Sequence, residues 1–135
     1  MTTILVGTDT TAAADLAVEH AAGLARARGG ELVVLYVGQD SDLRTVVDPD
    51  RSPDPAGYLA KMRERFPDVS TRTRTERGDP AEMICEVAAQ ESADTIVIGN
   101  RGAQGGRWRV RDSVPTMVLR HSPCSVFIVD TRKAQ

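Results

Sequence analysis

Short runs of aliphatic and β-branched residues, each only as long as a strand, recur along this chain and alternate with stretches of helical periodicity. Four such runs lie at 4–6, 32–37, 96–98 and 126–129. Runs that are apolar on both faces are typical of strands covered on both sides. Strands that alternate with helices favour a parallel sheet joined by right-handed crossovers. This pattern predicts an α/β protein.

The segments between these runs have the apolar three-four spacing of amphipathic helices. Each begins with a polar residue that can cap the first turn, and three of them have a proline in or next to that turn. The first is expected to begin at Thr10 or Thr11 and to stop at Gly29-Gly30. The predicted helices are 11–28, one that begins at Asp54-Pro55 and ends at Pro67, one that begins at Asp79-Pro80, and 113–121.

A fifth strand is predicted at 69–75, where threonine and arginine alternate as on a half-exposed sheet edge. The chain then reads β-α-β-α-β-α-β-α-β. If the first strand is central and the fourth is its neighbour, the result is a three-layer α/β/α sandwich with a five-stranded parallel sheet of order 3-2-1-4-5. A chain of 135 residues is expected to form this as one domain, 1–135.

The composition limits which binding partners and which cellular location are expected. Charged residues make up 27% of the chain and the net charge is −2, so we expect no nucleic-acid partner and no membrane partner. The N-terminus lacks the features of a signal peptide. Aromatic residues are only 4% of the chain, so Val, Ile, Leu and Ala must build the core. Cys85 and Cys124 are interpreted as small buried hydrophobic residues in a reducing cytoplasm.

A glycine-rich segment follows the apolar run 96–98. Gly99 ends that run, Gly102, Gly105 and Gly106 follow, and a helix start comes next at Ser113. A loop of this kind between a buried strand and a helix N-terminus can hold phosphate with backbone N–H groups. A nucleotide is therefore the first ligand to consider.

The predicted strand order places such a ligand where the winding of the sheet reverses, beyond the carboxyl ends of the first and fourth strands. Thr8 and Asp9 leave the first strand there, and 99–102 leaves the fourth. Asp9 has two compatible interpretations, as a partner of ribose hydroxyls or as a brace of its turn and helix. Ser113 is expected to be a helix N-cap whatever else it does.

One segment resembles the G-x2-G-x9-G-[ST] loop of the universal stress proteins. It consists of Gly99, two residues, Gly102, nine residues, and then Asp112-Ser113. Four further segments resemble the family in the same order, and together they cover nearly the whole chain apart from 39–67. They are ILVGTDTT (4–11), LVVLYV (32–37), RGDPAEMICEVAAQESADTIVIGNRG (77–102) and VLRHSPCSVFIV (118–129).

The resemblance implies a flavodoxin-like (Rossmann-like) fold and, in many members, ATP or AMP between the first and fourth strands. Carried over by position, Asp9 meets ribose, the backbone of Val37 meets adenine, and Gly99, Gly102 and Ser113 hold phosphates. The candidate nucleotide-binding residues are Thr8, Asp9, Val37, Gly99, Arg101, Gly102, Gly105, Asp112 and Ser113.

Asp112 departs from the family pattern, which has glycine at this position. If the loop needs a positive φ there, a Cβ costs about 1 kcal/mol. A carboxylate about 4 Å from a phosphate charge repels it by about 4 kcal/mol at an effective dielectric of about 20. Repulsion of that size turns a micromolar site into a millimolar one, so we interpret the phosphate loop as degraded.

Other residues of the same loop offset this cost in one interpretation. The positive charge of any two arginines of this loop outweighs the negative charge of Asp112 if they point inward. These arginines are Arg101 and those at 107, 109 and 111. A Mg²⁺ ion bound with ATP, bridging Asp112 to the phosphates, is a second means. In the alternative interpretation the arginines lie in solvent, while Trp108 and Val110 pack downward.

The sequence contains no convincing pair of nucleophile and base. His20 and His121 lie far apart in predicted helices, and the hydrolase and P-loop motifs are absent. We expect no catalytic residue, no metal-binding residue and no principal enzymatic activity. Residues 125–129 form an edge strand that is apolar on both faces. We predict a homodimer joined antiparallel through this strand, as the resemblance also implies.

Two functions lead from these features, and a third, a nucleotide-processing enzyme, is one that a turnover assay would exclude. The first is a cytoplasmic stress-response module that binds ATP or AMP with a degraded phosphate loop, and Asp9, Gly99, Gly102 and Ser113 favour it. The second is a homodimeric, stress-related interaction protein that no longer binds nucleotide, and Asp112 favours it.

Overall fold

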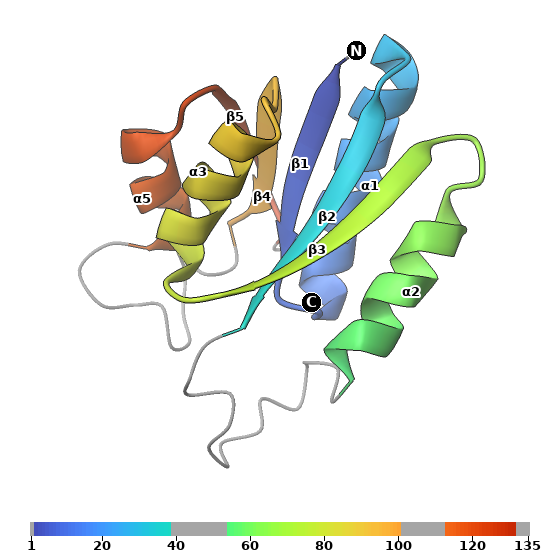
Figure 1. Ribbon diagram of the computed structural model, residues 1–135, viewed down its shortest axis with the longest axis horizontal. Coiled ribbons are helices and arrows are strands. Elements are labelled where there is room, and N and C mark those ends of the chain that lie inside the picture. Colours follow the sequence, from blue (N-terminus) through green and yellow to red (C-terminus); the bar gives the residue numbers. More distant parts are fainter. Residues whose placement is uncertain (1, 39–53, 101–112, 132–135) are drawn as a thin grey trace.

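Five parallel strands form one sheet in the order β3-β2-β1-β4-β5 (Figure 1). They are seen in a computed structural model that describes residues 2–38, 54–100 and 113–131. The predicted strand order and parallel pairing are confirmed. The strands are β1 (Thr3–Thr8), β2 (Glu31–Gly38), β3 (Ser70–Arg77), β4 (Thr95–Gly99) and β5 (Ser125–Val129).

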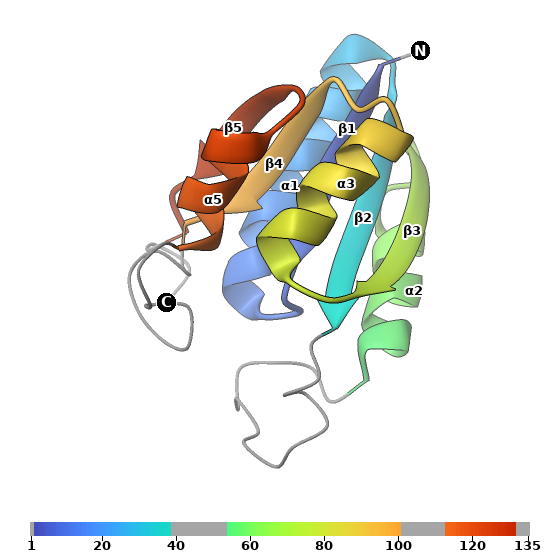
Figure 2. The ribbon, with the colours of Figure 1, turned by 60° about the vertical axis from the view of Figure 1, so that its left-hand side comes forward.

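Helices cover both faces of the sheet and complete the predicted three-layer sandwich. Helices α1 (Ala12–Arg28) and α2 (Pro55–Arg65) pack on one face, and α3 (Pro80–Gln90) and α5 (Val114–His121) pack on the other (Figure 1, Figure 2). Each pair closes its own apolar cluster against the sheet. Within the three described stretches of chain, no helix combines the length and the apolar character needed to cross a membrane.

Each helix begins at the capping residue that its local sequence indicates. The Thr11 hydroxyl accepts the Ala14 N–H at 3.1 Å at the start of α1. Asp54, Asp79 and Ser113 accept an N–H in the first turn of α2, α3 and α5, and each of these helices carries a proline in that turn. A cap followed by proline is a purely local signal, which is why the sequence indicates these starts to within a residue.

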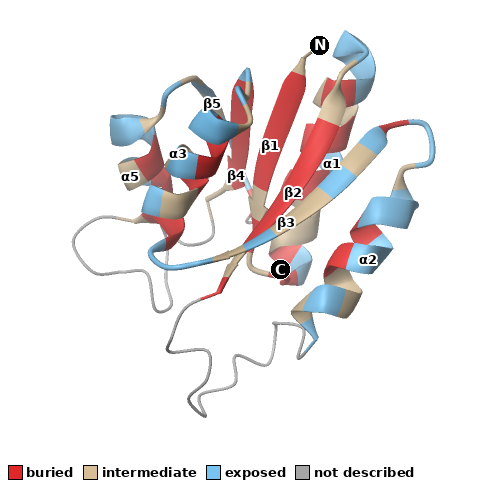
Figure 3. Cartoon of the chain, in the orientation of Figure 1, coloured by how far each residue is buried: buried red, intermediate tan, exposed pale blue. Residues whose placement is uncertain are grey.

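The core consists of aliphatic side chains, as the low aromatic content requires. Strands β1, β2 and β4 are buried along almost their whole length, and Leu5, Val34 and Ile96 are inaccessible to solvent (Figure 3). Because these strands are covered on both faces, their side chains are apolar in both directions. The alternation of burial on β3 instead marks it as an edge.

Two predictions need correction. Strand β3 runs over Ser70–Arg77 rather than 69–75, because it pairs with β2 along its full length up to Arg77. Cys85 and Cys124 are half-buried rather than buried. Cys85 faces a hollow between two helices, and Cys124 lies just before the edge strand β5, so neither thiol is fully covered.

The two edges of the sheet differ in chemistry. On β3, Arg72 and Arg74 both donate to the carboxylate of Glu91, the C-cap of α3, at 2.7 and 2.9 Å, and Arg72 also donates to Glu31 at 3.0 Å. The hydrogen bond from Arg72 holds the pKa of Glu91 below its usual value. On β5, by contrast, Phe127 and Ile128 are 41% and 38% exposed. These two residues are consecutive, so they lie on opposite faces of the strand.

Candidate functional site

The carboxyl ends of β1 and β4 lie side by side, at the point where the strand order reverses. Extending the paired register of the two strands puts Thr8 level with Gly99. On the other side of β1, Thr8 pairs with Tyr36, which brings Val37 beside the turn that follows β1. Helices in this fold run antiparallel to the strands, so helix N-termini face the same edge. We call this region the β1/β4 site.

Asp9 braces the beginning of α1. Its Oδ1 accepts the Thr11 N–H at 3.1 Å and the Thr11 hydroxyl at 2.6 Å. Thr11 is in turn the N-cap of α1. Asp9 therefore fixes the cap rather than capping the helix itself, and one of the two interpretations of this residue is confirmed. Asp9 is half-buried and lies in the turn at the carboxyl end of β1.

Thr10 adopts a conformation that β-branched residues rarely take. Its φ is +69°, and the residue is only 5% exposed. A positive φ in a β-branched residue costs on the order of 1–3 kcal/mol and persists only where the surroundings impose it. One of those surroundings is visible, because the Thr10 N–H donates to the Thr8 hydroxyl at 3.0 Å.

A chain of hydrogen bonds ties this turn to α2. The Thr8 hydroxyl donates to the Tyr58 phenol oxygen at 3.2 Å, and the Tyr58 hydroxyl donates to the Asp15 carboxylate of α1. Burial, and then the bond to Asp15, raise the pKa of the Tyr58 phenol far above its usual value. The phenol therefore stays protonated and remains a donor throughout the physiological pH range.

Gly99 is confined by the segment that follows β5. A Cβ at Gly99 would lie 2.8 Å from the Cγ2 methyl of Thr131. Thr131 cannot easily move, because its N–H and its hydroxyl both donate to the Asn100 side-chain oxygen, at 3.0 and 3.1 Å. The glycine at the end of β4 is thus required by packing within the fold, in addition to any contact with a ligand.

Ser113 is the N-cap of α5, as predicted. Its hydroxyl accepts the Thr116 N–H at 3.3 Å and lies 2.9 Å from the Thr116 hydroxyl. Val37 is half-buried at the end of β2. Of the nine candidate residues, Thr8, Asp9, Val37, Gly99 and Ser113 are therefore placed at the ends of strands or at a helix start. Arg101, Gly102, Gly105 and Asp112 lie outside the described residues.

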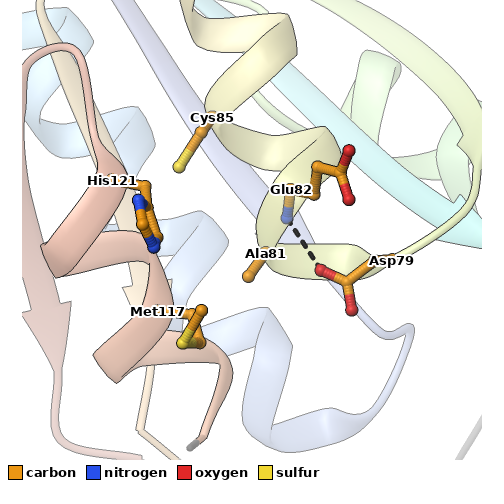
Figure 4. A pocket seen from close by; sticks show the side chains of 6 residues that line it. All are labelled: Asp79, Ala81, Glu82, Cys85, Met117 and His121. Atoms are coloured by element: carbon orange, nitrogen blue, oxygen red, sulfur yellow. Dashed lines mark hydrogen bonds between the residues drawn. The ribbon is translucent and has the colours of Figure 1, made fainter.

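A separate hollow of about 380 Å³ lies between α3 and α5 (Figure 4). Met117 and His121 of α5 face Ala81 and Cys85 of α3 across it, and burial raises the pKa of the Cys85 thiol. None of the described nucleotide-binding candidates lines it. Over residues 2–38, 54–100 and 113–131, no group of three or more His, Cys, Asp or Glu side chains is arranged to hold a metal ion.

Sequence reasoning missed Tyr58, Asp15 and Thr131 as members of this region. A signal for Tyr58 was present, because a tyrosine next to the buried stripe of an amphipathic helix needs a partner for its hydroxyl. The identity of that partner depends on tertiary packing, since Thr8 and Asp15 lie 50 and 43 residues away in sequence.

Comparison with known proteins identifies the family. The family model described as the universal stress protein family matches residues 1–130. A universal stress protein of Mycolicibacterium smegmatis is 32% identical over 96% of this chain, and the chain spans 46% of that relative's length. A universal stress protein of Mycobacterium tuberculosis (strain H37Rv) is 31% identical, with 96% of each chain covered. A crystal structure of a universal stress protein in complex with cAMP superposes with a TM-score of 0.80 at 27% identity, covering 96% of this chain and 97% of that one.

Proposed function

This chain belongs to the universal stress protein family, and from that premise we propose that it is a stress-response module that binds an adenine nucleotide at the β1/β4 site. One observation carries the proposal. Asp9 and Gly99 lie where the strand order reverses, and the N-terminus of α5 lies at the same carboxyl edge of the sheet. This is where α/β sheets of this type bind ligands. The relative crystallised with cAMP shares this fold over nearly the whole chain.

The proposed ligand is AMP or ATP, with Mg²⁺ accompanying ATP. Asp9 is suited to ribose hydroxyls, because its carboxylate is held in a defined position by Thr11. The N-terminus of α5 is suited to phosphate, because the helix dipole favours an anion there. We propose that the protein senses the nucleotide and does not consume it, and that it acts in the cytoplasm.

Calorimetric titration with AMP and with Mg-ATP tests the proposal. We expect micromolar binding of AMP, and about tenfold weaker binding for Asp9→Asn, which keeps the bonds to Thr11 but loses a charged hydrogen-bond acceptor. Asp94→Asn is the matched control. Asp94 accepts the Thr3 N–H at 2.7 Å at the opposite end of the sheet, so the same charge is removed far from the site and affinity should stay unchanged.

The second candidate function is an interaction protein that has lost nucleotide binding, and Asp112→Gly separates it from the first. If the natural protein does not bind at millimolar nucleotide and Asp112→Gly does bind, the carboxylate has closed the site and the interaction protein becomes the better conclusion. Absence of binding by both proteins contradicts the nucleotide proposal outright.

We further propose that two copies join antiparallel through β5. The support is the exposure of Phe127 and Ile128 on β5, which is the last strand of the sheet among the described residues. The Phe127 ring also packs against His20 of α1, with 6.0 Å between ring centroids, so the aromatic face is held in place for a partner. An apolar, preformed edge is a ready template for pairing with another strand.

A further inference from the structure

Tyr58 is the one side chain of α2 whose hydrogen bonds, among those of the described residues, reach both the end of β1 and the first turn of α1. Its phenol oxygen accepts the Thr8 hydroxyl at 3.2 Å, and its own proton goes to the Asp15 carboxylate. Leu59 and Met62 of α2 also pack against the sheet, and Arg65 forms an exposed ion pair with Glu19 of α1 at 3.2 Å. Non-directional packing fixes a helix less sharply than a hydrogen-bonded chain does.

The Thr8 hydroxyl links Tyr58 to the strained turn. Because its proton is given to Tyr58, a lone pair of Oγ1 is directed to the Thr10 N–H, 3.0 Å away. Thr10 is held at φ +69° in this arrangement. Thr10 lies between Asp9 and Thr11, so its conformation sets how the Asp9 carboxylate meets the two Thr11 donors that hold it.

We propose that Tyr58 is a positioning residue of the β1/β4 site: acting through Thr8, it holds the Asp9–Thr10 turn in its strained conformation and thereby couples ligand affinity to the seating of α2. This inference rests on the proposed function, because it assigns a regulator to that same site. Tyr58 itself need not touch the ligand.

The coupling runs in both directions. A change that pulls α2 from the sheet removes the acceptor of the Thr8 hydroxyl and frees the turn to relax, which lowers the affinity for nucleotide. By reciprocity, a nucleotide held by Asp9 stabilises the turn and so the seating of α2 by the same free energy. Strain that is held in place at a ligand site is a form of preorganisation, and releasing it costs affinity.

A double-mutant cycle with AMP titration tests the proposal. Tyr58→Phe keeps the ring and removes the hydroxyl, and we expect AMP to bind about tenfold more weakly, as for the loss of one ordinary hydrogen bond. Thr10→Gly removes the strain, because glycine adopts a positive φ without cost. If Tyr58 acts by holding Thr10, Tyr58→Phe in the Thr10→Gly background should weaken AMP binding by less than about threefold.

Val87→Ala is the control for a merely structural role. It trims a fully buried side chain of α3, on the face of the sheet opposite to α2, and removes neither hydrogen bond of Tyr58. We expect it to lower the melting temperature without a measurable change in AMP affinity. Equal losses of affinity in Val87→Ala and Tyr58→Phe would overturn the proposal, and so would unchanged affinity in Tyr58→Phe.

Failure of the proposed function gives a different result. If the natural protein binds no AMP, the proposed function is wrong, and the claim that Tyr58 controls AMP affinity is wrong with it. The link from Tyr58 to Thr10 is then judged without nucleotide, from the same four proteins in chemical unfolding. Non-additive losses of stability for Tyr58→Phe and Thr10→Gly support the link, and strictly additive losses overturn it.

Discussion

The Cγ2 methyl of Thr131 lies 2.8 Å from the position that a Cβ on Gly99 would occupy, so the end of β4 and the segment after β5 fit together only if residue 99 has no side chain. The contact is unyielding because Asn100 accepts two hydrogen bonds from Thr131. A residue first noticed as part of a phosphate loop thus has a second role in closing the fold next to the site.

Gly99→Ala should lower the free energy of unfolding by about 2 kcal/mol through overpacking. Gly7→Ala is the control, because its Cβ would meet only the flexible end of Ile84, at 3.1 Å, and should cost less than about 1 kcal/mol. Chemical denaturation measures both. Thr131→Ser removes the methyl and keeps the hydroxyl, so it should restore most of the stability lost by Gly99→Ala. No rescue would mean that the contact is not the cause.

Glu91→Gln should destabilise the protein in a manner that depends on pH. At pH 7 we expect a loss of about 1 kcal/mol, because two partly exposed charged hydrogen bonds are weakened. The pKa of Glu91 is depressed in the folded state by Arg72, so its contribution is present above the unfolded pKa and is lost as pH falls through the folded pKa.

Urea denaturation at several pH values between 7 and 3 measures this effect. The difference between the natural protein and Glu91→Gln should narrow toward the acid end of the series. Glu86→Gln, an exposed position on the same helix, is the control and should show no such trend. A difference that stays constant with pH contradicts the assignment to the Arg72–Glu91 pair.

Cys85 should react slowly with alkylating reagents. Burial raises the pKa of its thiol, and a raised pKa means less thiolate at any given pH. In Cys124→Ser, where Cys85 is the remaining cysteine, the alkylation rate should rise with pH through a midpoint above the usual value of about 8.5. The same variant in denaturant should react like free cysteine. A midpoint at or below the usual value in the folded protein contradicts the prediction.

Ser113 offers a way to separate capping from ligand binding. Ser113→Ala should lower the stability by about 1 kcal/mol, because the cap of α5 is lost. Ser113→Asp keeps a capping oxygen but adds a negative charge where the phosphate is proposed to lie. We expect it to retain the stability of the natural protein and to bind AMP at least about tenfold more weakly by calorimetry. Undiminished AMP binding by Ser113→Asp argues against phosphate at this helix start.

Phe127→Asp should dissociate the proposed dimer, because a carboxylate would be buried in an apolar interface. Light scattering at micromolar concentration should give twice the 14.6 kDa of one chain for the natural protein and a single chain for the variant. Thr75→Asp, an exposed position on the opposite edge strand β3, is the control and should remain dimeric. A natural protein that is monomeric contradicts the proposal.

Much of the fold could be predicted from local sequence signals. Strands β1, β2 and β4 are apolar on both faces because both faces are covered. Their continuous apolar runs in the sequence reflect that burial. The starts of α2, α3 and α5 follow from a cap and a proline within a few residues. The bounds 70–77 of β3 could not be predicted from the local sequence, because they depend on pairing with β2.

The candidate site was only partly predictable, because its contacts join distant residues. The Asp9–Thr11 brace spans two positions and follows from turn chemistry. The bond between Thr8 and Tyr58 spans 50 positions, and the fit of Thr131 to Gly99 depends on how β5 lies beside β4. No local pattern encodes such contacts. Asp112 and the arginines of its loop lie outside the described residues, so their effect on binding remains a prediction.

The unlike edges of the sheet have a consequence for assembly. Growth into fibres requires that each added copy still presents a surface that binds another copy. An open sheet has such a surface when both of its edges accept strands. Here β3 ends the sheet with Arg72 and Arg74 engaged to Glu91, while β5 ends it with Phe127 and Ile128. Two copies joined through β5, as proposed, would leave their β3 edges facing outward. Edge-to-edge association through β5 would then be self-terminating: it would stop at a pair and could not grow into a polymer.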